Sequence, residues 1–269
     1  MFSSAMMLNA QTTEMKNKKD IIITPEAHDW AIGFNAAPFL SYAGNIFNAN
    51  TNNSVSTAFV DGNQAIYGKY FLTNSTAIRG SLRIMSYNAK NEILTDTNTI
   101  NSNPSYVTDV MKSTGAGFVL SGGYEMRRGK NRLQGYYGGE LMFRFGGTTP
   151  NTSFTYGAPL DSANIAMGGA VNGRVLSSKA GSTLGFGLRA FIGAEFFFLP
   201  KMSLAAEYGF GFMYSTTSAG ETVSEFYGYE TPSATTKTTY KVTTATGKSS
   251  GFLLDTDNLG GSLRLMYHF

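Results

Sequence analysis

The stretch that decides the fold runs from Leu184 to Pro200 and reads LGFGLRAFIGAEFFFLP. It is almost wholly apolar and aromatic, yet it contains Arg189 and Glu195. It is too short and too rich in glycine for a membrane-spanning helix. In an extended strand, alternate side chains point to opposite faces. The two charges then share one face, and the other face carries only apolar side chains.

The composition of the whole chain favours a β-rich protein. The 269 residues include 31 Gly, 20 Phe and 15 Tyr, and only 14% are charged, whereas an ordinary soluble domain has roughly 25%. No run of about 18 uncharged apolar residues exists, so a helical membrane protein is not expected. The net charge of +3 is too small to indicate a nucleic-acid partner. The absence of cysteine excludes disulfides and thiolate metal sites.

Eight segments bounded by turn signals show the same alternation with a period of two. In the central part of each segment, charged side chains fall on one face only. The connections alternate between short turns, at Asn74-Ser75, around Gly129-Lys130 and at Pro200-Lys201, and long polar loops near residues 42–61, 89–114, 147–182 and 216–256. The predicted strands lie near residues 29–41, 62–73, 76–88, 115–127, 132–146, 183–198, 202–215 and 257–269.

These patterns predict an all-β fold, a transmembrane antiparallel up-and-down β-barrel of eight strands. Hydrocarbon offers the backbone no hydrogen bonds, so a sheet in a membrane must close and leave no edge. Such barrels join their strands by short periplasmic turns and long extracellular loops. The rival fold is a soluble sandwich or lipocalin-like barrel with its charged face outside.

The domain division follows from the barrel hypothesis. A short apolar stretch precedes Ala10-Gln11, as in the tail of a secretory signal, so residues 1–10 are predicted to be a residual signal peptide. Residues 11–27 are predicted to be a periplasmic N-terminal segment, and residues 28–269 the barrel.

The charged face is predicted to be the lumen. An eight-stranded interior is just wide enough to be filled by side chains, and ionised groups removed from water must be paired. We therefore expect a structural charge network, with an ion pathway as the alternative. The predicted members are Lys69, Arg79, Arg83, Glu125, Glu140, Arg144, Arg189, Glu195, Glu207 and Arg264.

The closing sequence GGSLRLMYHF resembles the insertion signal of outer-membrane β-barrels, with Leu263, Leu265, Tyr267 and Phe269 at alternate positions. The region from about residue 28 to 269 resembles the small eight-stranded barrels of the OmpA/OmpX type. This resemblance implies an integral outer-membrane protein that contacts outer-membrane lipid and lipopolysaccharide. It also implies insertion by the barrel assembly machinery. The triplet at Ser162, Asp-Ser-Ala, is similar to an O-glycosylation sequon of the Bacteroidota and is otherwise a loop turn.

No residue set singles itself out as a catalytic, cofactor-binding or metal site. His28 and His268 are the two histidines, and His268 is predicted to be a rim residue bonded to the periplasmic turns. The last predicted loop offers Phe226, Tyr227 and Tyr229 as anchors for a partner, such as another outer-membrane protein. We expect a non-enzymatic structural or interaction protein without a cofactor. The alternatives are a narrow passive channel and a lipid-modifying outer-membrane enzyme.

Overall fold

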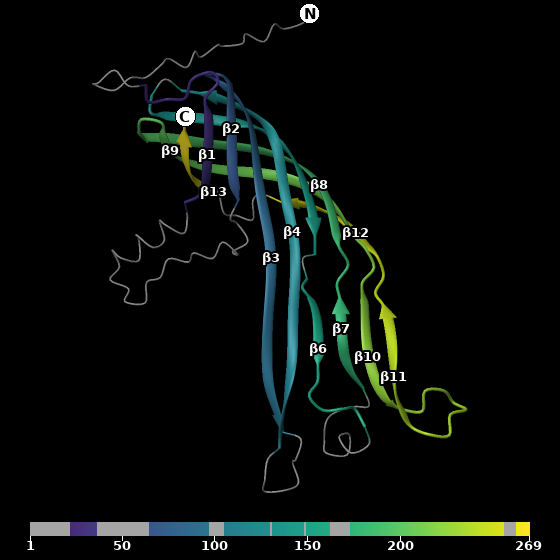
Figure 1. The fold of residues 1–269 in the computed structure, drawn as a ribbon. Helices are drawn as coiled ribbons and strands as arrows, with labels where there is room; N and C mark the ends of the chain where they lie inside the picture. The colour runs from purple at the N-terminus through teal and green to yellow at the C-terminus, as the bar shows by residue number, and fades with distance from the viewer. Residues whose placement is uncertain are drawn as a thin grey trace, which may run out of the picture.

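The computed structural model shows one antiparallel β-sheet of 13 strands in the described part of the chain (Figure 1). Within that part, no helix is long and apolar enough to cross a membrane. The all-β class and the antiparallel sheet are therefore confirmed, whereas the predicted number of strands is not. The structure describes residues 22–36, 65–96, 105–129, 131–147, 149–161, 173–255 and 262–269.

Eight of the strands pair in a closed sequence, here called the strand ring. Each hydrogen-bonded pair is antiparallel, and the order β1-β2-β3-β4-β5-β8-β9-β13 returns to β1. Each of the eight predicted segments overlaps one of these strands. They are β1 (Trp30–Asn35), β2 (Ile66–Thr73), β3 (Thr76–Asp96), β4 (Tyr106–Arg128), β5 (Leu133–Gly146), β8 (Thr183–Leu199), β9 (Met202–Thr217) and β13 (Ser262–His268).

The remaining five strands lie where the sequence predicts loops. They are β6 (Asn151–Thr155), β7 (Gly173–Lys179), β10 (Glu221–Gly228), β11 (Thr238–Ala245) and β12 (Ser249–Asp255). Strands β3 and β4 also continue well past their predicted ends, so the predicted loops at 89–114, 147–182 and 216–256 are wrong over much of their length. The predicted loop at 42–61 lies outside the described residues.

The physical reason for this error is that a strand exposed on both faces needs no apolar alternation. Its ladder consists of backbone hydrogen bonds, which polar side chains do not prevent. A polar segment without periodic apolar residues is ordinarily predicted to be a loop, so these strands are missed from the sequence. Lys237 to Thr246 is the exception, because its alternation of Thr, Tyr and Val predicts an extended hairpin, and β11 forms there and pairs with β10.

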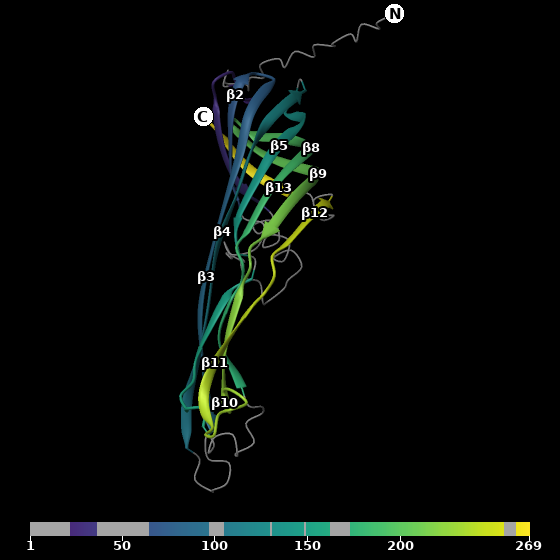
Figure 2. The ribbon, with the colours of Figure 1, turned by 90° about the vertical axis from the view of Figure 1, so that its right-hand side faces the viewer.

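The outer parts of β3 and β4 join four of these strands in a sheet that we call the distal sheet. Its strand order is β3-β4-β6-β7-β10-β11. In Figures 1 and 2 the distal sheet is long and curved and extends from one end of the ring. We call that end the outer end of the ring. The opposite, inner end carries the turns after β2, β4 and β8, and the chain terminus at Phe269 pairs there with Trp30.

The distal sheet has its own polar contacts, centred on Arg174 of β7. Its Nε donates to Glu225 Oε1 at 2.6 Å, and its guanidinium lies 4.0 Å from the centre of the Tyr156 ring. The Tyr156 hydroxyl donates to the carbonyl of Val175 at 2.8 Å. Burial raises the pKa of this hydroxyl above its ordinary value, so it keeps its proton and remains a donor. These contacts tie β6, β7 and β10 together without an apolar core.

The N-terminal segment closes over the inner end of the ring. Ile23 is 1% exposed, and its carbonyl accepts from the backbone N–H of Lys201 at 3.2 Å. Ala27 N–H donates to Asn74 Oδ1 at 2.8 Å, and Lys201 forms an ion pair with Asp29. The predicted segment 11–27 is thus described only from residue 22, where it lies on the inner turns. The predicted signal peptide, 1–10, lies outside the described residues.

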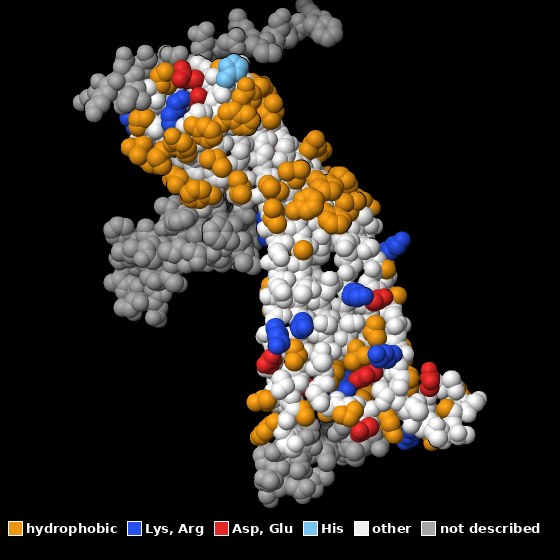
Figure 3. Space-filling model, in the orientation of Figure 1, with side chains coloured by type: hydrophobic (Ala, Val, Ile, Leu, Met, Phe, Trp, Pro, Cys, Tyr) orange, Lys and Arg blue, Asp and Glu red, His pale blue; other side chains and the backbone are white. Residues whose placement is uncertain are grey.

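Burial alternates along each ring strand, as the parity of the sequence predicts. In β8, Arg189 and Glu195 are buried, whereas Leu188 and Ile192 are 57% and 65% exposed. Within the ring, the exposed side chains of the eight strands include one charge, Arg128 at the inner end of β4. Figure 3 shows hydrophobic side chains over the ring and most of the visible charges on the distal sheet.

Gly193 of β8 illustrates how tightly the inward face is packed. A Cβ atom built there would lie 2.4 Å from Tyr136 Cζ and 2.5 Å from the Ala206 carbonyl oxygen. Tyr136 is 1% exposed and has no room to move toward solvent. By contrast, a Cβ on outward-facing Gly122 meets no atom within 4 Å.

We predict that Gly193→Ala lowers the free energy of unfolding by about 1–3 kcal/mol, because overpacking a filled interior forces neighbours out of place. Gly122→Ala is the matched control, and it should be neutral or stabilise slightly, since glycine within a strand is unfavourable. Urea unfolding midpoints of the two variants test this. Equal midpoints would contradict the packing described for Tyr136.

Candidate functional site: a charge network inside the strand ring

The inward face of the ring gathers charged side chains from all eight strands except β1. Eight of the ten predicted lumen residues are each at least 91% buried and joined by ion pairs. Parity places them inward, and their ion-pair contacts divide them into two neighbouring groups, here called the outer and the inner level. They are Lys69, Arg79, Glu125, Glu140, Arg189, Glu195, Glu207 and Arg264.

The outer level of the network is centred on Glu207 of β9. Arg79 binds this carboxylate with both terminal nitrogens, at 2.6 and 3.1 Å. Arg264 does the same at 2.8 and 2.7 Å. Arg189 Nη1 lies 2.8 Å from Glu207 and 2.9 Å from Glu140. Paired two-point contacts of this kind are the strongest that guanidinium and carboxylate groups form.

The inner level is centred on Glu195 of β8 and Glu125 of β4. Lys69 Nζ lies 2.9 Å from Glu125 and 3.2 Å from Glu195. Arg127 Nη1 lies 3.3 and 2.8 Å from the same two carboxylates. Arg79 joins the two levels, because its Nη1 also lies 3.4 Å from Glu125.

Aromatic side chains fill the space between the charges and the ring wall. The guanidinium of Arg79 lies 3.9 Å from the Phe191 ring centre, and that of Arg264 lies 4.0 Å from the Tyr67 ring centre. Lys69 Nζ is 4.7 Å from the centre of the Tyr136 ring. The faces of these rings are electron-rich and attract cations. They also exclude water from the ion pairs.

Two members of the network escape the sequence interpretation. Arg127 is 2% exposed and also donates to Gln134, but it begins the basic run from Arg127 to Arg132, which the sequence predicts to be a turn, and the predicted strand ends at this residue. Arg127 follows Glu125 by two residues, so the parity of the strand would have placed Arg127 inward beside Glu125. His268 is predicted to contact the turns, yet its ring Nε2 lies 3.0 Å from Glu195 Oε1. Its backbone N–H alone reaches a turn, donating to the Lys201 carbonyl.

The trio of Ser203, His268 and Glu195 contains the residue types of a hydrolytic triad without its geometry. A triad needs the histidine between the other two groups, with one ring nitrogen on each. Here Ser203 Oγ and Glu195 Oε1 both approach Nε2, at 3.1 and 3.0 Å, and Ser203 also bonds Glu195 directly. All three side chains are fully buried. The arrangement suits a structural hydrogen-bond cluster.

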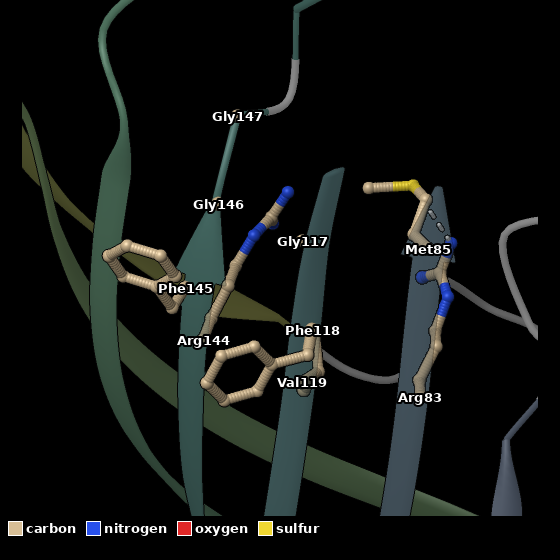
Figure 4. Close-up of a pocket in the computed structure, with 9 residues that line it drawn as sticks. All are labelled: Arg83, Met85, Gly117, Phe118, Val119, Arg144, Phe145, Gly146 and Gly147. Atoms are coloured by element: carbon tan, nitrogen blue, oxygen red, sulfur yellow. Dashed lines mark hydrogen bonds between the residues drawn. The ribbon is translucent and has the colours of Figure 1, made fainter. Parts of the chain in front are cut away.

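Arg83 and Arg144 do not join the network. Between their level and that of Arg79 lies a row of uncharged residues that includes Ser81, Ser121 and Met142. Both arginines are half-buried at the outer end of the ring, beside a cavity of about 190 Å³ (Figure 4). No acidic side chain of the described residues lies within ion-pair distance of either one.

The other predicted residues are separate from the network. Leu263, Leu265, Tyr267 and Phe269 lie along the outward face of β13, with Tyr267 and Phe269 exposed and their rings stacked 5.9 Å apart. In the distal sheet Tyr229 is 53% exposed.

Phe226 and Tyr227, the other two proposed anchors, are half-buried in β10, and Phe226 stacks on Tyr240. Ser162, the possible glycosylation site, lies outside the described residues. Across the described ranges, no group of three or more His, Asp or Glu side chains could hold a metal ion. The sequence matches no protein-family model and no curated protein.

We predict that Glu207→Gln lowers the free energy of unfolding by about 3–5 kcal/mol, because it leaves buried guanidinium groups without their carboxylate. Glu221→Gln provides a matched control. Glu221 pairs with Lys179 at 3.0 Å on an exposed part of the distal sheet, where an ion pair contributes about 0–1 kcal/mol. Denaturant unfolding of both variants measures the difference, and a Glu207→Gln loss as small as the control's would contradict a coupled network.

Proposed function

We propose that this chain is an integral outer-membrane β-barrel protein without enzymatic activity, and that it acts as a structural or interaction component. The strand ring crosses the bilayer, its lumen is filled by the charge network, and the distal sheet stands outside the cell as the partner-binding element. The observation that carries this proposal is the division of the ring into an apolar exposed face and a charged buried face.

The exposed face has the character of a lipid-facing surface. Large apolar side chains project from every ring strand, including Leu141 at 66% and Ile192 at 65% exposure. A soluble monomer rarely exposes contiguous apolar patches beyond a few hundred Å². Along β8 the apolar outward positions run from Phe186 to Phe198, and about 9–11 tilted residues suffice to cross a bilayer.

The closure of the ring supports the same proposal. A sheet with a free edge would leave N–H and C=O groups unpaired in hydrocarbon, at several kcal/mol each. In the described structure each ring strand has a paired neighbour on both sides. The inner end, with its short turns and the N-terminal segment, then corresponds to the periplasmic side of such a barrel, and the distal sheet to the extracellular side.

The packing of the lumen favours a structural role over a passive channel. The two levels of ion pairs and the rings of Tyr136 and Phe191 occupy the interior, and Ile23 covers its inner end. A conducting pore would need a continuous water-filled path past these groups. No arrangement of the described residues matches a known acid–base or nucleophilic site.

The distal sheet supports partner binding because it is large, polar and open at both edges. Beyond Leu82 the free side of β3 has no described partner strand, and among the described strands β11 pairs with β10 alone. Exposed strand edges can accept a strand from another protein. The turn from Tyr229 to Lys237 adds an exposed aromatic ring, with Lys237 Nζ 5.7 Å from its centre.

We predict that Ile192→Arg prevents stable insertion into lipid vesicles, since a cation on the lipid face near the bilayer midplane is unfavourable by about 2–4 kcal/mol. Val242→Arg, on exposed β11, is the matched control and should insert like the parent protein. The measurement is the fraction of refolded protein that floats with vesicles and migrates faster on an unheated gel. Water solubility of the parent protein without detergent would overturn the membrane proposal.

The partner proposal is tested by shortening one turn. Gly228 and Thr238 are the last paired residues of β10 and β11, so Asn-Gly can replace residues 229–237 and keep the hairpin. We predict that cross-linking in native outer membranes captures one stoichiometric partner with the parent protein and none with the shortened variant, while both insert equally. A parent protein that remains monomeric and uncross-linked would contradict this prediction.

A further inference from the structure

The cavity at the outer end of the ring lies where the ring wall changes partners. Strand β4 pairs with β5 as far as Gly117 and Gly146, and its next pairing is between Thr114 and Asn151 of β6. The Gly147 N–H still donates to the Ala116 carbonyl at 3.2 Å, and no ladder pair is described between this contact and the pair of Thr114 with Asn151. A notch of about 190 Å³ is formed there, lined by both inward-facing and outward-facing residues.

The inward part of the notch is cationic. Arg83 and Arg144 occupy one register row, on either side of Val119. Figure 4 shows both side chains extending along the strands toward the outer end, Arg144 toward Gly117 and Gly147, and Arg83 toward Met85. Arg83 donates a long contact of 3.8 Å to the sulfur of Met85.

These two arginines are not neutralised by the network below them. Arg79 precedes Arg83 by four residues of β3, which is about 13 Å of strand. The network itself holds five basic side chains (Lys69, Arg79, Arg127, Arg189 and Arg264) and four glutamates, so it supplies no spare carboxylate. A half-buried guanidinium pair in this position attracts an anion.

The outward part of the notch is aromatic. Phe118 and Phe145 line it, with ring centres 5.9 Å apart, and Phe118 also packs on Phe143 at 5.8 Å. The cavity is smaller than the roughly 300–1,000 Å³ of pockets for drug-sized ligands, so it suits one compact group. Three glycines line it as well, which lets a ligand approach the backbone.

We propose that this notch is a binding site for a phosphate group, held by Arg83 and Arg144. A phosphate carries up to two charges and several oxygens, so it can accept from two guanidinium groups at once. The phosphate is either free or part of a lipid whose acyl chain lies on Phe118 and Phe145. The proposal of a phosphate site depends only on the geometry of the notch. The proposal that the phosphate belongs to a lipid depends also on the proposed membrane position of the ring.

The test titrates purified protein in non-ionic detergent with three probes. They are dioctanoyl phosphatidic acid, dioctanoyl glycerol as its phosphate-free counterpart, and inorganic phosphate, and native mass spectrometry counts the bound molecules. We expect one phosphatidic acid per chain and no dioctanoyl glycerol. Equal affinity for inorganic phosphate would assign the site to free phosphate, and preference for the phosphatidic acid would assign it to a lipid. Binding of neither phosphate probe would overturn the proposal.

The double variant Arg83→Gln, Arg144→Gln should weaken phosphate binding by about tenfold or more. Arg128→Gln, which removes an exposed arginine at the inner end of the ring, is the control and should bind like the parent protein. The double variant should also keep the parent's urea midpoint, because neither arginine has a carboxylate to lose. Unchanged binding, or a large fall in that midpoint, would show that the two arginines serve the fold instead.

Vesicle flotation separates this proposal from the proposed function. A double variant that floats with vesicles but loses phosphate binding supports both. If the parent protein binds phosphate but does not float with vesicles, the phosphate site would be supported and the membrane proposal would be contradicted.

Discussion

Four glutamates and five basic side chains are held out of water inside the strand ring, and the rest of the structure depends on their mutual ion pairing. An isolated ionised group in such an interior is strongly unfavourable, and one missing partner leaves a buried charge behind. Glu207 alone accepts from three arginines on three different strands. The carboxylates therefore act as cross-links between strands, in addition to the backbone ladder.

The same constraint explains why the ring is apolar outside. Every charge within the ring except Arg128 points inward or lies at the notch, so the outer face is left to Leu, Ile, Phe and Tyr. In the distal sheet the pattern changes, because strands exposed to water on both sides need only satisfied backbone groups. Polar threonines and serines are sufficient there, together with local contacts such as that of Arg174 with Glu225.

Several parts of the site follow from the sequence, and the exceptions have identifiable causes. Parity places Arg189 and Glu195 on one face of β8 without any knowledge of their partners. It also places Arg83 and Arg144 inward, but it cannot show that a row of uncharged residues separates them from the glutamates. Arg127 is hidden by its basic neighbours. The strands β6, β7 and β10 carry no apolar period, so nothing in the sequence distinguishes them from loops.

The sequence by itself determined which face of each ring strand is apolar and which is charged, because the side-chain direction alternates strictly along an extended chain. Only the tertiary structure decided which charges meet. Lys69 and Glu195 are separated by 126 residues, and they lie together because β2 and β8 face each other across a closed ring. Register between distant strands sets these contacts, and register is a property of the whole sheet that no single segment contains.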